Sequence, residues 1–497
     1  MSTQTILRQA SSKLAVDAAV AWNIPVPLII NGRDVTTDKT FPVIGPLTNK
    51  KIWSAAAVSD RHVAEAARAA ETAFPAWSTT KPSFRRDIFL RAADVINKRR
   101  AELGEYMHHE IGANQDYQDF ILGLAIEGLK DTAGRIAGAV QGEVPESIHD
   151  GMRAIAHRRP YGVVLGIAPW NAPYHLGLRS VTYALAAGNT TILKGSELSP
   201  RCYWAIADVF REAGLPDGCL NLIFHQPADA AAVTESIIAH PAVKKINFTG
   251  STKVGSIIAA SAGRHLKPVL MELGGKASAV VLKDADLEKA ALHCTRGAFL
   301  NAGQICMSTE RIIVHSSIAE DFKVALSAAI ERTFESDSDI PTLVTAAAAS
   351  RNHGLVADAI SKGAKAIPLF GGRSVEAVET HMRPVVLTGV DKSMDLYASE
   401  SFGPSVSFFT FETEAEALAL ANDTEYGLAA SVFTEDLRAG FRISEALQSG
   451  AVHINSMTVH DEFALPHGGV KKSGFGRFNG YQGLEEFLYW KTVTWME

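Results

Sequence analysis

The chain has 497 residues, of which 47% are hydrophobic and 21% charged, and its formal net charge at pH 7 is −6. This length exceeds what one hydrophobic core normally serves, so we expect two or three domains. The composition is typical of a globular protein, and the slightly acidic balance gives no support for binding nucleic acid or an anionic membrane surface. No stretch has the length and apolarity of a membrane span.

Four cysteines, at positions 202, 219, 294 and 306, are spaced without a Cys-x-x-Cys pair. This spacing argues against a disulfide framework and against a zinc site, so we predict no bound metal. A reducing compartment, the cytoplasm, fits best. Residues 1–23 are rich in Ser and Ala with one acid, which is weakly similar to a transit peptide and leaves mitochondrial import as an alternative.

The N-terminal part of the chain reads as short strands and turns from Ile29 to about Lys51, followed by helices. Apolar residues at helical spacing predict these helices over Asp60–Ala76, Pro82–Gly112 and Gln115–Ala137.

Between Tyr161 and Glu272 short apolar runs alternate with helical segments. This alternation indicates parallel βαβ units with both faces of the sheet covered, and such sheets bind ligands at the carboxyl ends of their strands. The predicted strands are Val163–Ala168, Thr190–Lys194, Asn221–Phe224, Lys245–Thr249 and Pro268–Glu272.

A second alternating set runs from about Ala277 to Ala464, and the tail beyond Gly469 ends in aromatic and apolar residues. Apolar ends of globular chains usually dock onto something, a subunit partner being one candidate. The predicted strands are Ala279–Leu282, Ile312–Val314, Val385–Thr388, Val406–Phe411, Ala429–Phe433 and Val452–Ile454.

The first strand end of the βαβ region holds an asparagine between two prolines. Pro169 and Pro173 flank Asn171, and prolines so placed exclude regular strand and helix. The Asn171 amide is placed either to donate a hydrogen bond to a developing oxyanion or to cap the next helix. The residues alone leave both interpretations open.

Two further strand ends suit a dinucleotide. Lys194 and Glu197 follow the second strand, where they either bind ribose hydroxyls or form a solvated turn. Gly250 and Ser251 begin a helix, so its first backbone N–H groups either face a phosphate or are merely capped. This turn is neither G-x-G-x-x-G nor G-x-x-x-x-G-K-[ST], so it is only moderately specific.

The last strand end and one cysteine supply reactive groups. Glu272 lies beside Gly274 and Gly275, where a carboxylate can move, reach a water and act as a general base, although a solvated Glu beside a glycine turn is more common. Cys306 lies in a polar break between a helix and a strand, which suits a thiolate nucleophile. Taken alone, a free cysteine is more often a buried apolar residue.

In this order, these groups resemble the aldehyde dehydrogenase superfamily. Pro169-Trp170-Asn171 is similar to the family's oxyanion motif, and Glu272-Leu273-Gly274-Gly275-Lys276 is similar to its general-base motif. Gly303-Gln304-Ile305-Cys306 is similar to the nucleophile motif. Glu400-Ser401-Phe402-Gly403-Pro404 is similar to the segment that holds the nicotinamide ribose. The resemblance covers nearly the whole chain.

The resemblance implies an α/β fold with a Rossmann-type NAD-binding domain (1–138 and 160–271) and an α/β catalytic domain (272–468). A small β oligomerisation element (139–159 and 478–497) is implied as well, and with it a homodimer or a homotetramer.

The resemblance also implies roles for single residues. Cys306 would form a thiohemiacetal and then a thioester with an aldehyde, Asn171 would donate to the oxyanion, and Glu272 would activate the hydrolytic water. The residues that would bind NAD are Lys194, Glu197, Gly250, Ser251, Lys276, Glu400, Phe402 and Trp170.

The substrate class depends on fewer residues. Asn171-Ala172-Pro173 followed by Arg179 is similar to the branch that oxidises salicylaldehyde, vanillin and other benzaldehyde-type substrates. Arg179 either faces the aromatic ring or pairs with a nearby carboxylate. The resemblance places in the substrate tunnel Tyr174, Arg179, Ile305, Met307, His460 and Phe463, with Leu176 and Leu465.

The chain departs from the family pattern in two places. His467 stands where Phe is usual, and Ser399 and Ser401 flank Glu400 where Glu and a β-branched residue are usual. Neither change removes a catalytic group. We therefore predict an NAD-dependent aromatic aldehyde dehydrogenase. The alternative within the same chemistry is an aliphatic aldehyde or semialdehyde dehydrogenase, and the remote alternative is a non-catalytic binding or structural protein.

Overall fold

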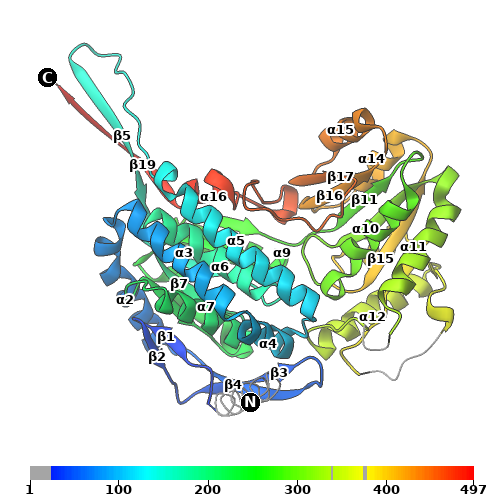
Figure 1. Ribbon diagram of the computed structural model, residues 1–497, viewed down its shortest axis with the longest axis horizontal. Coiled ribbons are helices and arrows are strands. Elements are labelled where there is room, and N and C mark those ends of the chain that lie inside the picture. The colour runs from blue at the N-terminus through cyan, green and yellow to red at the C-terminus, as the bar shows by residue number, and fades with distance from the viewer. Residues whose placement is uncertain (1–23, 337–339, 373–377, 497) are drawn as a thin grey trace, which may run out of the picture.

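The computed structural model describes residues 24–336, 340–372 and 378–496, so the transit-peptide alternative for residues 1–23 lies outside the described residues. Two α/β halves lie side by side, and a long two-stranded ribbon projects from one of them (Figure 1). None of the described helices is both long enough and apolar enough to cross a membrane.

The first half is built on a sheet whose strand order is β18-β10-β9-β6-β7-β8-β1-β2. Strands β10, β9, β6, β7 and β8 are parallel, and the outer strands pair antiparallel. The parallel strands are apolar and largely buried, as expected of a sheet covered on both faces. The strands are β1 Leu28–Ile30, β2 Arg33–Val35, β6 Val163–Ile167, β7 Thr190–Lys194, β8 Leu220–Ile223, β9 Val243–Thr249, β10 Val269–Glu272 and β18 Gly474–Phe475.

Helices cover both faces of this sheet, and α6 is the most deeply placed of them. Pro173 begins α6, since proline fits the first helical position, and Gly188 ends it with a φ of +96°. Every side chain of α6 is buried. The helices of this half are α2 Asp60–Ser78, α3 Pro82–Lys98, α4 Arg100–Ile111, α5 Gln115–Ala139, α6 Pro173–Ala187, α7 Pro200–Glu212, α8 Ala230–Ala239, α9 Thr252–Arg264 and α16 Gly480–Glu485.

The prediction of a single helix over Pro82–Gly112 was wrong, because the chain breaks at Arg99. This residue ends α3 and precedes α4, with φ −98° and ψ 15°. Its guanidinium is largely buried and donates to Glu102 at 2.8 Å and to Asp208 of α7 at 2.7 Å. The apolar periodicity continues through this break, so it gave no signal of the change in direction.

The second half contains a sheet of order β13-β14-β15-β12-β11-β16-β17, parallel except for β13. Its strands are β11 Ala277–Val281, β12 Thr309–His315, β13 Lys365–Ala366, β14 Val385–Thr388, β15 Ser405–Phe411, β16 Ala429–Phe433 and β17 Ala451–Ile454. Its helices are α10 Leu287–Phe299, α11 Ala319–Thr333, α12 Ala346–Ser361, α13 Asp395–Ala398, α14 Glu414–Asn422 and α15 Leu437–Ala446. The predicted βαβ alternation of both halves is confirmed.

Four adjacent parallel strands bring the predicted site segments to one edge of the first sheet. Glu272 on β10 lies opposite Thr249 on β9, while Ile167 on β6 lies opposite both Phe248 and Lys194. The segments that follow these strands therefore begin side by side, as expected for the carboxyl ends of parallel strands. Directly after Glu272 the chain enters β11, so this edge adjoins the second half.

Two antiparallel pairs lie outside the main sheets. Strand β5 Met152–Pro160 pairs along its whole length with β19 Leu488–Met496, and the two form the projecting ribbon (Figure 1). β19 is exposed after its first residue, with Trp490 and Trp495 on its surface. Strand β3 Thr40–Gly45 pairs with β4 Lys50–Ala56.

A buried carboxylate anchors the helix that follows the Lys194–Glu197 turn. Glu110 at the end of α4 is fully buried and accepts hydrogen bonds from the backbone N–H groups of Arg201 (2.8 Å) and Cys202 (3.0 Å). It also accepts from the Trp53 indole at 3.0 Å. These N–H groups belong to the first turn of α7, which has no side-chain cap of its own.

We expect Glu110→Gln to lower the free energy of unfolding by about 1–3 kcal/mol, because an amide has one acceptor oxygen and its NH₂ would face a backbone N–H. The midpoint of urea denaturation measures this. Glu105→Gln, a change on the exposed face of the same helix, is the matched control and should leave the midpoint unchanged. Equal midpoints for the two variants would contradict the anchoring role.

Candidate active site

The loop before Cys306 has an unusual backbone. Asn301, Ala302 and Gly303 have φ of +50°, +60° and +72° in succession, a left-handed run that costs free energy for residues with a Cβ. Buried Gln304 holds the loop: its Nε2 donates to the carbonyls of Asn301 (3.0 Å) and Thr342 (3.1 Å). Cys306 is thus presented by a braced loop and not by a mobile one.

Close backbone packing explains two glycines of the general-base motif. A Cβ on Gly275 would lie 2.1 Å from the Cys306 carbonyl oxygen, and one on Gly274 would lie 2.5 Å from a carboxylate oxygen of Glu400. Either contact is too short for any side chain. The sequence interpretation was that these glycines let Glu272 move. In the structure they allow the segment after Glu272 to pack closely against Cys306 and Glu400.

The thiol and the carboxylate lie in contact. Cys306 is half-buried, and its Sγ lies 3.6 Å from Oε1 of Glu272. Burial raises the pKa of the Cys306 thiol well above its usual value, and the negative charges of Glu272 and Glu400 raise it further. At neutral pH the free thiol is therefore mostly protonated, with a base beside it.

Asn171 lines the same cavity as Cys306, and hydrogen bonds hold both its side chain and its backbone carbonyl. Its Nδ2 donates to the Gln304 carbonyl at 2.9 Å, which leaves a second N–H on that nitrogen, and its backbone carbonyl accepts from Tyr117 Oη at 2.9 Å. The helix-cap interpretation does not apply, because Ala172 is the N-cap of α6. The side chain is thus available to donate toward the cavity.

Glu272 is buried, ionised and paired with cations. Its Oε2 accepts from Nη1 of Arg179 at 3.0 Å, and its Oε1 lies 3.2 Å from Nε2 of His467. Burial by itself would raise the pKa of this carboxyl, but His467 and Arg179 outweigh it and lower the pKa to about 2.

Arg179 pairs with carboxylates, as the second of the two interpretations of this residue expected. Its side chain is almost fully buried, and besides Glu272 it contacts Asp461 and the ring nitrogen Nε2 of His175. The guanidinium is not part of the wall of the cavity at Cys306. Within the described parts of the chain, no group of three or more His, Cys, Asp or Glu side chains is arranged to hold a metal ion.

A cavity of about 420 Å³, its open mouth included, lies over the cysteine. Of the residues predicted to line it, Ile305, Met307 and Leu176 do so. Its wall comprises Tyr117, Phe120, Ile121, Leu124, Asn171, Ala172, His175, Leu176, Glu272, Ile305, Cys306, Met307, Val459 and Asp461.

Besides Arg179, four predicted substrate residues lie outside this wall, and one of them, Leu465, is half exposed. The other three make contacts elsewhere in the structure. Tyr174 is buried, and its hydroxyl donates to the Leu103 carbonyl at 3.0 Å. His460 stacks on His453 with ring centroids 4.8 Å apart. Phe463 packs against the His175 ring and lines a smaller hollow behind the cavity. None of the three belongs to the wall at Cys306.

Sequence reasoning missed the wall contributed by α5. Tyr117, Phe120, Ile121 and Leu124 follow the i, i+3, i+4, i+7 spacing of one helix face. That pattern marked a buried face, but nothing in the sequence indicated that the face meets the cysteine loop. The contacts of His467 with Glu272 and of Asp461 with Arg179 were missed for the same reason, because both residues come from a loop near the C-terminus.

The cofactor residues fit the adenosine half of a dinucleotide. Lys194 is buried, burial lowers the pKa of its ammonium, and the carboxylate of Glu197 opposes that shift. Ser251 is the N-cap of α9, whose first turn holds no acidic residue, so its N–H groups and dipole are compatible with a phosphate. Gly250 precedes it, where a Cβ would lie 2.5 Å from the Phe248 ring.

The segment around Glu400 fits the nicotinamide half of the dinucleotide. Glu400 Oε1 accepts from the Gly275 N–H at 2.8 Å, while burial and the charge of Glu310 raise its pKa to about 8. Phe402, with φ +48°, packs edge-on against Trp170 at 5.9 Å between ring centroids. Lys276 is committed elsewhere: its Nζ contacts Glu310 at 2.5 Å and the Ser399 carbonyl at 2.7 Å.

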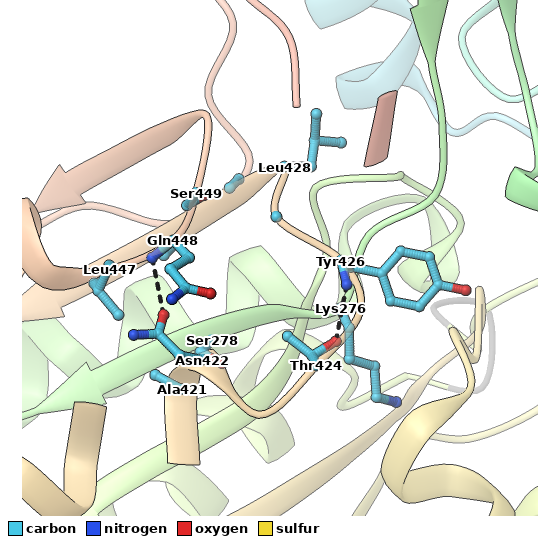
Figure 2. Close-up of a pocket in the computed structure, with 13 residues that line it drawn as sticks. Lys276, Ser278, Ala421, Asn422, Thr424, Tyr426, Leu428, Leu447, Gln448 and Ser449 are labelled. Atoms are coloured by element: carbon cyan, nitrogen blue, oxygen red, sulfur yellow. Dashed lines mark hydrogen bonds between the residues drawn. The ribbon is translucent and has the colours of Figure 1, made fainter. Parts of the chain in front are cut away.

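A separate hollow lies beside Lys276 and Tyr426 (Figure 2). Its polar groups bond among themselves, Asn422 accepting from the Gln448 N–H at 2.8 Å and Thr424 from the Tyr426 N–H at 3.2 Å. The reactive groups described above do not line it. The cavity at Cys306 is therefore the candidate active site.

Known proteins are similar to this chain over nearly its whole length. A model of the Aldehyde dehydrogenase family matches residues 34–493. A vanillin dehydrogenase from Pseudomonas fluorescens is 43% identical over 95% of this chain and 98% of its own length. A salicylaldehyde dehydrogenase from Pseudomonas sp. (strain C18) is 37% identical over 94% and 97%. The crystal structure of a salicylaldehyde dehydrogenase from Pseudomonas putida G7, complexed with salicylaldehyde, superposes with a TM-score of 0.91 at 35% identity, covering 95% of this chain and 98% of that one.

We expect Glu272→Gln to speed alkylation of Cys306 by iodoacetamide about 3- to 10-fold at pH 8. The charge of Glu272 raises the pKa of the thiol, so its removal lowers that pKa and increases the thiolate fraction. Mass spectrometry of the Cys306 peptide gives the rate. Glu435→Gln, an exposed remote change, is the control, and an unchanged or slower rate in Glu272→Gln would contradict the coupling.

Proposed function

The chain belongs to the aldehyde dehydrogenase family, and we propose that it oxidises aromatic aldehydes to carboxylic acids with NAD. The family assignment confirms the resemblance found in the sequence, and as a member the protein is an oxidoreductase that acts on aldehydes with NAD or NADP. The observation that supports the proposal is the contact of Cys306 with Glu272 inside an apolar cavity that also contains Asn171.

The aromatic substrate is supported by the cavity wall and by the relatives. Tyr117, Phe120 and Met307 provide aromatic and polarisable surface for a ring, and small Ala172 leaves room for it. The relatives named above act on vanillin and on salicylaldehyde, whose common part is a substituted benzaldehyde.

The first half of the reaction would form a bond between Cys306 and the aldehyde carbon. The thiol loses its proton to solvent, and the resulting thiolate attacks the carbonyl carbon. The remaining N–H of Asn171 and the backbone N–H of Cys306 would stabilise the oxyanion. Loss of hydride from the thiohemiacetal would leave a thioester on Cys306, and NAD would supply the hydride acceptor. The residues that would hold NAD include Lys194, Glu197, Glu400 and Phe402.

The second half would hydrolyse the resulting thioester. Glu272 takes a proton from a water molecule, the water oxygen bonds to the carbonyl carbon, and the bond to Cys306 Sγ breaks. The products are the carboxylic acid and the free cysteine.

NAD is proposed over NADP because of Glu197. This half-buried carboxylate follows β7, and a fixed negative charge beside the adenosine ribose disfavours a 2′-phosphate. We also propose that the segments 139–159 and 478–497, which contribute most of the β5–β19 ribbon, are the oligomerisation element of a homodimer or homotetramer. Its exposed tryptophans are compatible with burial against a second copy.

A semialdehyde carries a distal carboxylate that a binding site would have to neutralise. The residues that line the cavity include no Lys or Arg, and the nearest guanidinium, that of Arg179, is engaged by Glu272 and Asp461. The described wall therefore favours an uncharged ring over a second carboxylate. A non-catalytic role is disfavoured because nucleophile, base and amide share one cavity.

We expect purified protein with NAD to show the highest kcat/KM for vanillin, salicylaldehyde and benzaldehyde, with lower values for hexanal and succinic semialdehyde. Cys306→Ala should abolish NADH formation with all five, because the nucleophile is lost. Absorbance at the NADH wavelength measures the rates. A preference for hexanal or the semialdehyde would overturn the substrate assignment, and NADH formation by Cys306→Ala would overturn the mechanism.

We expect Ala172→Phe to lower kcat/KM for vanillin about tenfold or more, because a phenyl ring would occupy part of the cavity. Acetaldehyde, which needs little room, should be affected less than about threefold. The measurement is the ratio of the two kcat/KM values. The control is Ala101→Phe, at an exposed position of α4, because a buried site such as Ala213 is not suitable. A parallel loss for both aldehydes would contradict the steric role.

A further inference from the structure

Glu272 contacts His467, and the residue that is usual at position 467 in the family could not make this contact. His467 occupies the position where Phe is usual, and Phe could not form a hydrogen bond with Glu272. Here His467 is buried, and its Nε2 lies 3.2 Å from Glu272 Oε1, the same oxygen that faces Cys306 Sγ at 3.6 Å. The imidazole therefore touches the oxygen that has to accept the proton of water.

Without a charge on His467, the two buried carboxylates of this site would share a single positive charge, that of Arg179. Two carboxylates, Glu272 and Asp461, are buried together, and Arg179 is the guanidinium that touches both. A second positive charge is supplied when His467 is protonated, since its Nε2 faces Glu272 and its Nδ1 lies 3.9 Å from Asp461. Burying an unpaired carboxylate is costly, so the pair of acids favours the imidazolium.

Other ionisable side chains lie near the imidazole, on α6 and on β17. From α6, Arg179 opposes its protonation, and His175 is itself kept neutral because burial and Arg179 lower its pKa. From β17, the pKa of His453 is lowered to about 4 by burial and by its two histidine neighbours, so it is uncharged at neutral pH. Burial lowers the pKa of His467, but Asp461 and Glu272 reverse this and raise it above its usual value.

We propose that His467 is a positioning residue for Glu272, holding its carboxylate toward Cys306, and that loss of the His467 proton makes Glu272 a stronger base for hydrolysis of the thioester. The inference rests on the role proposed above for Glu272. When His467 is protonated, two cations hold the carboxylate and weaken its basicity. When His467 is neutral, Arg179 alone remains, and a carboxylate with one cation accepts a proton more readily.

The proton balance of the step is complete. Water gives one proton to Glu272 Oε1 while its oxygen bonds to the thioester carbon, and the carbon–sulfur bond breaks to leave the Cys306 thiolate. The neutral His467 Nε2, at 3.2 Å, can then take the proton from Glu272 and restore the carboxylate. No further reactant is required.

The test follows hydrolysis directly, from pH 6 to 9.5. Full-length protein in excess is mixed with NAD and salicylaldehyde and quenched in acid at set times, and intact mass spectrometry records the decay of the acyl adduct on Cys306. NADH absorbance recorded in parallel reports acylation. The variants are His467→Phe and His467→Gln, with His293→Gln as matched control, because His293 lies on α10 and has no contact with Glu272.

In the wild type and in His293→Gln, we expect the decay rate to rise about 3- to 10-fold with pH as His467 loses its proton. Both His467 variants should lose this rise while still forming NADH. An unchanged pH profile in both variants would overturn the proposal, as would an adduct that never accumulates in the wild type at pH 6. Absence of NADH in the wild type would instead contradict the proposed function. Rescue of the profile by Gln would show a merely structural role.

Discussion

The ion pair between Arg179 and Glu272 is the interaction that allows Glu272, the proposed general base, to be buried in an apolar cavity. A carboxylate at this depth would otherwise take up a proton and could not act as a base at neutral pH. Arg179 comes from the middle of α6, a helix whose every side chain is buried, so Glu272 is held by the interior of the first half. A second carboxylate, Asp461, holds the guanidinium from the other side.

The remaining parts of the site depend on close contact between backbones. Gly274 and Gly275 let the segment after β10 approach Glu400 and the Cys306 carbonyl, and Gly303 lies against the carbonyl of Gly403. These contacts join loops from both halves, so a side chain at any of these positions would move Cys306 relative to Glu272. The left-handed backbone from Asn301 to Gly303 persists because the Gln304 side chain bonds both to Asn301 of the same loop and to Thr342 and Val344 of a neighbouring segment.

The sequence predicted what depends on local pattern and failed where a contact depends on distant segments. The strands, their parallel alternation and the common edge of Glu272, Asn171 and Lys194 followed from short apolar runs and from the topology they impose. The break at Arg99 was missed because the ion pair with Asp208 that accompanies it is tertiary. Four tunnel positions, Tyr174, His460, Phe463 and Leu465, were placed by analogy of position, but the direction of a side chain depends on what packs around it. His467 was recognised as a departure, yet its partner could be found only in three dimensions.

The location of the positive charge links the base to the substrate. Had the Arg179 guanidinium pointed into the cavity, it would have suited an anionic substrate and left Glu272 without its permanently charged partner. Placed behind the wall instead, it keeps Glu272 ionised while the surface that meets the ring stays largely apolar, from Phe120 to Met307. A charge one layer away still acts on the carboxylate, because the intervening medium is protein and not water. The placement of Arg179 behind the wall therefore explains both the preference for an uncharged aromatic ring and the burial of an ionised Glu272.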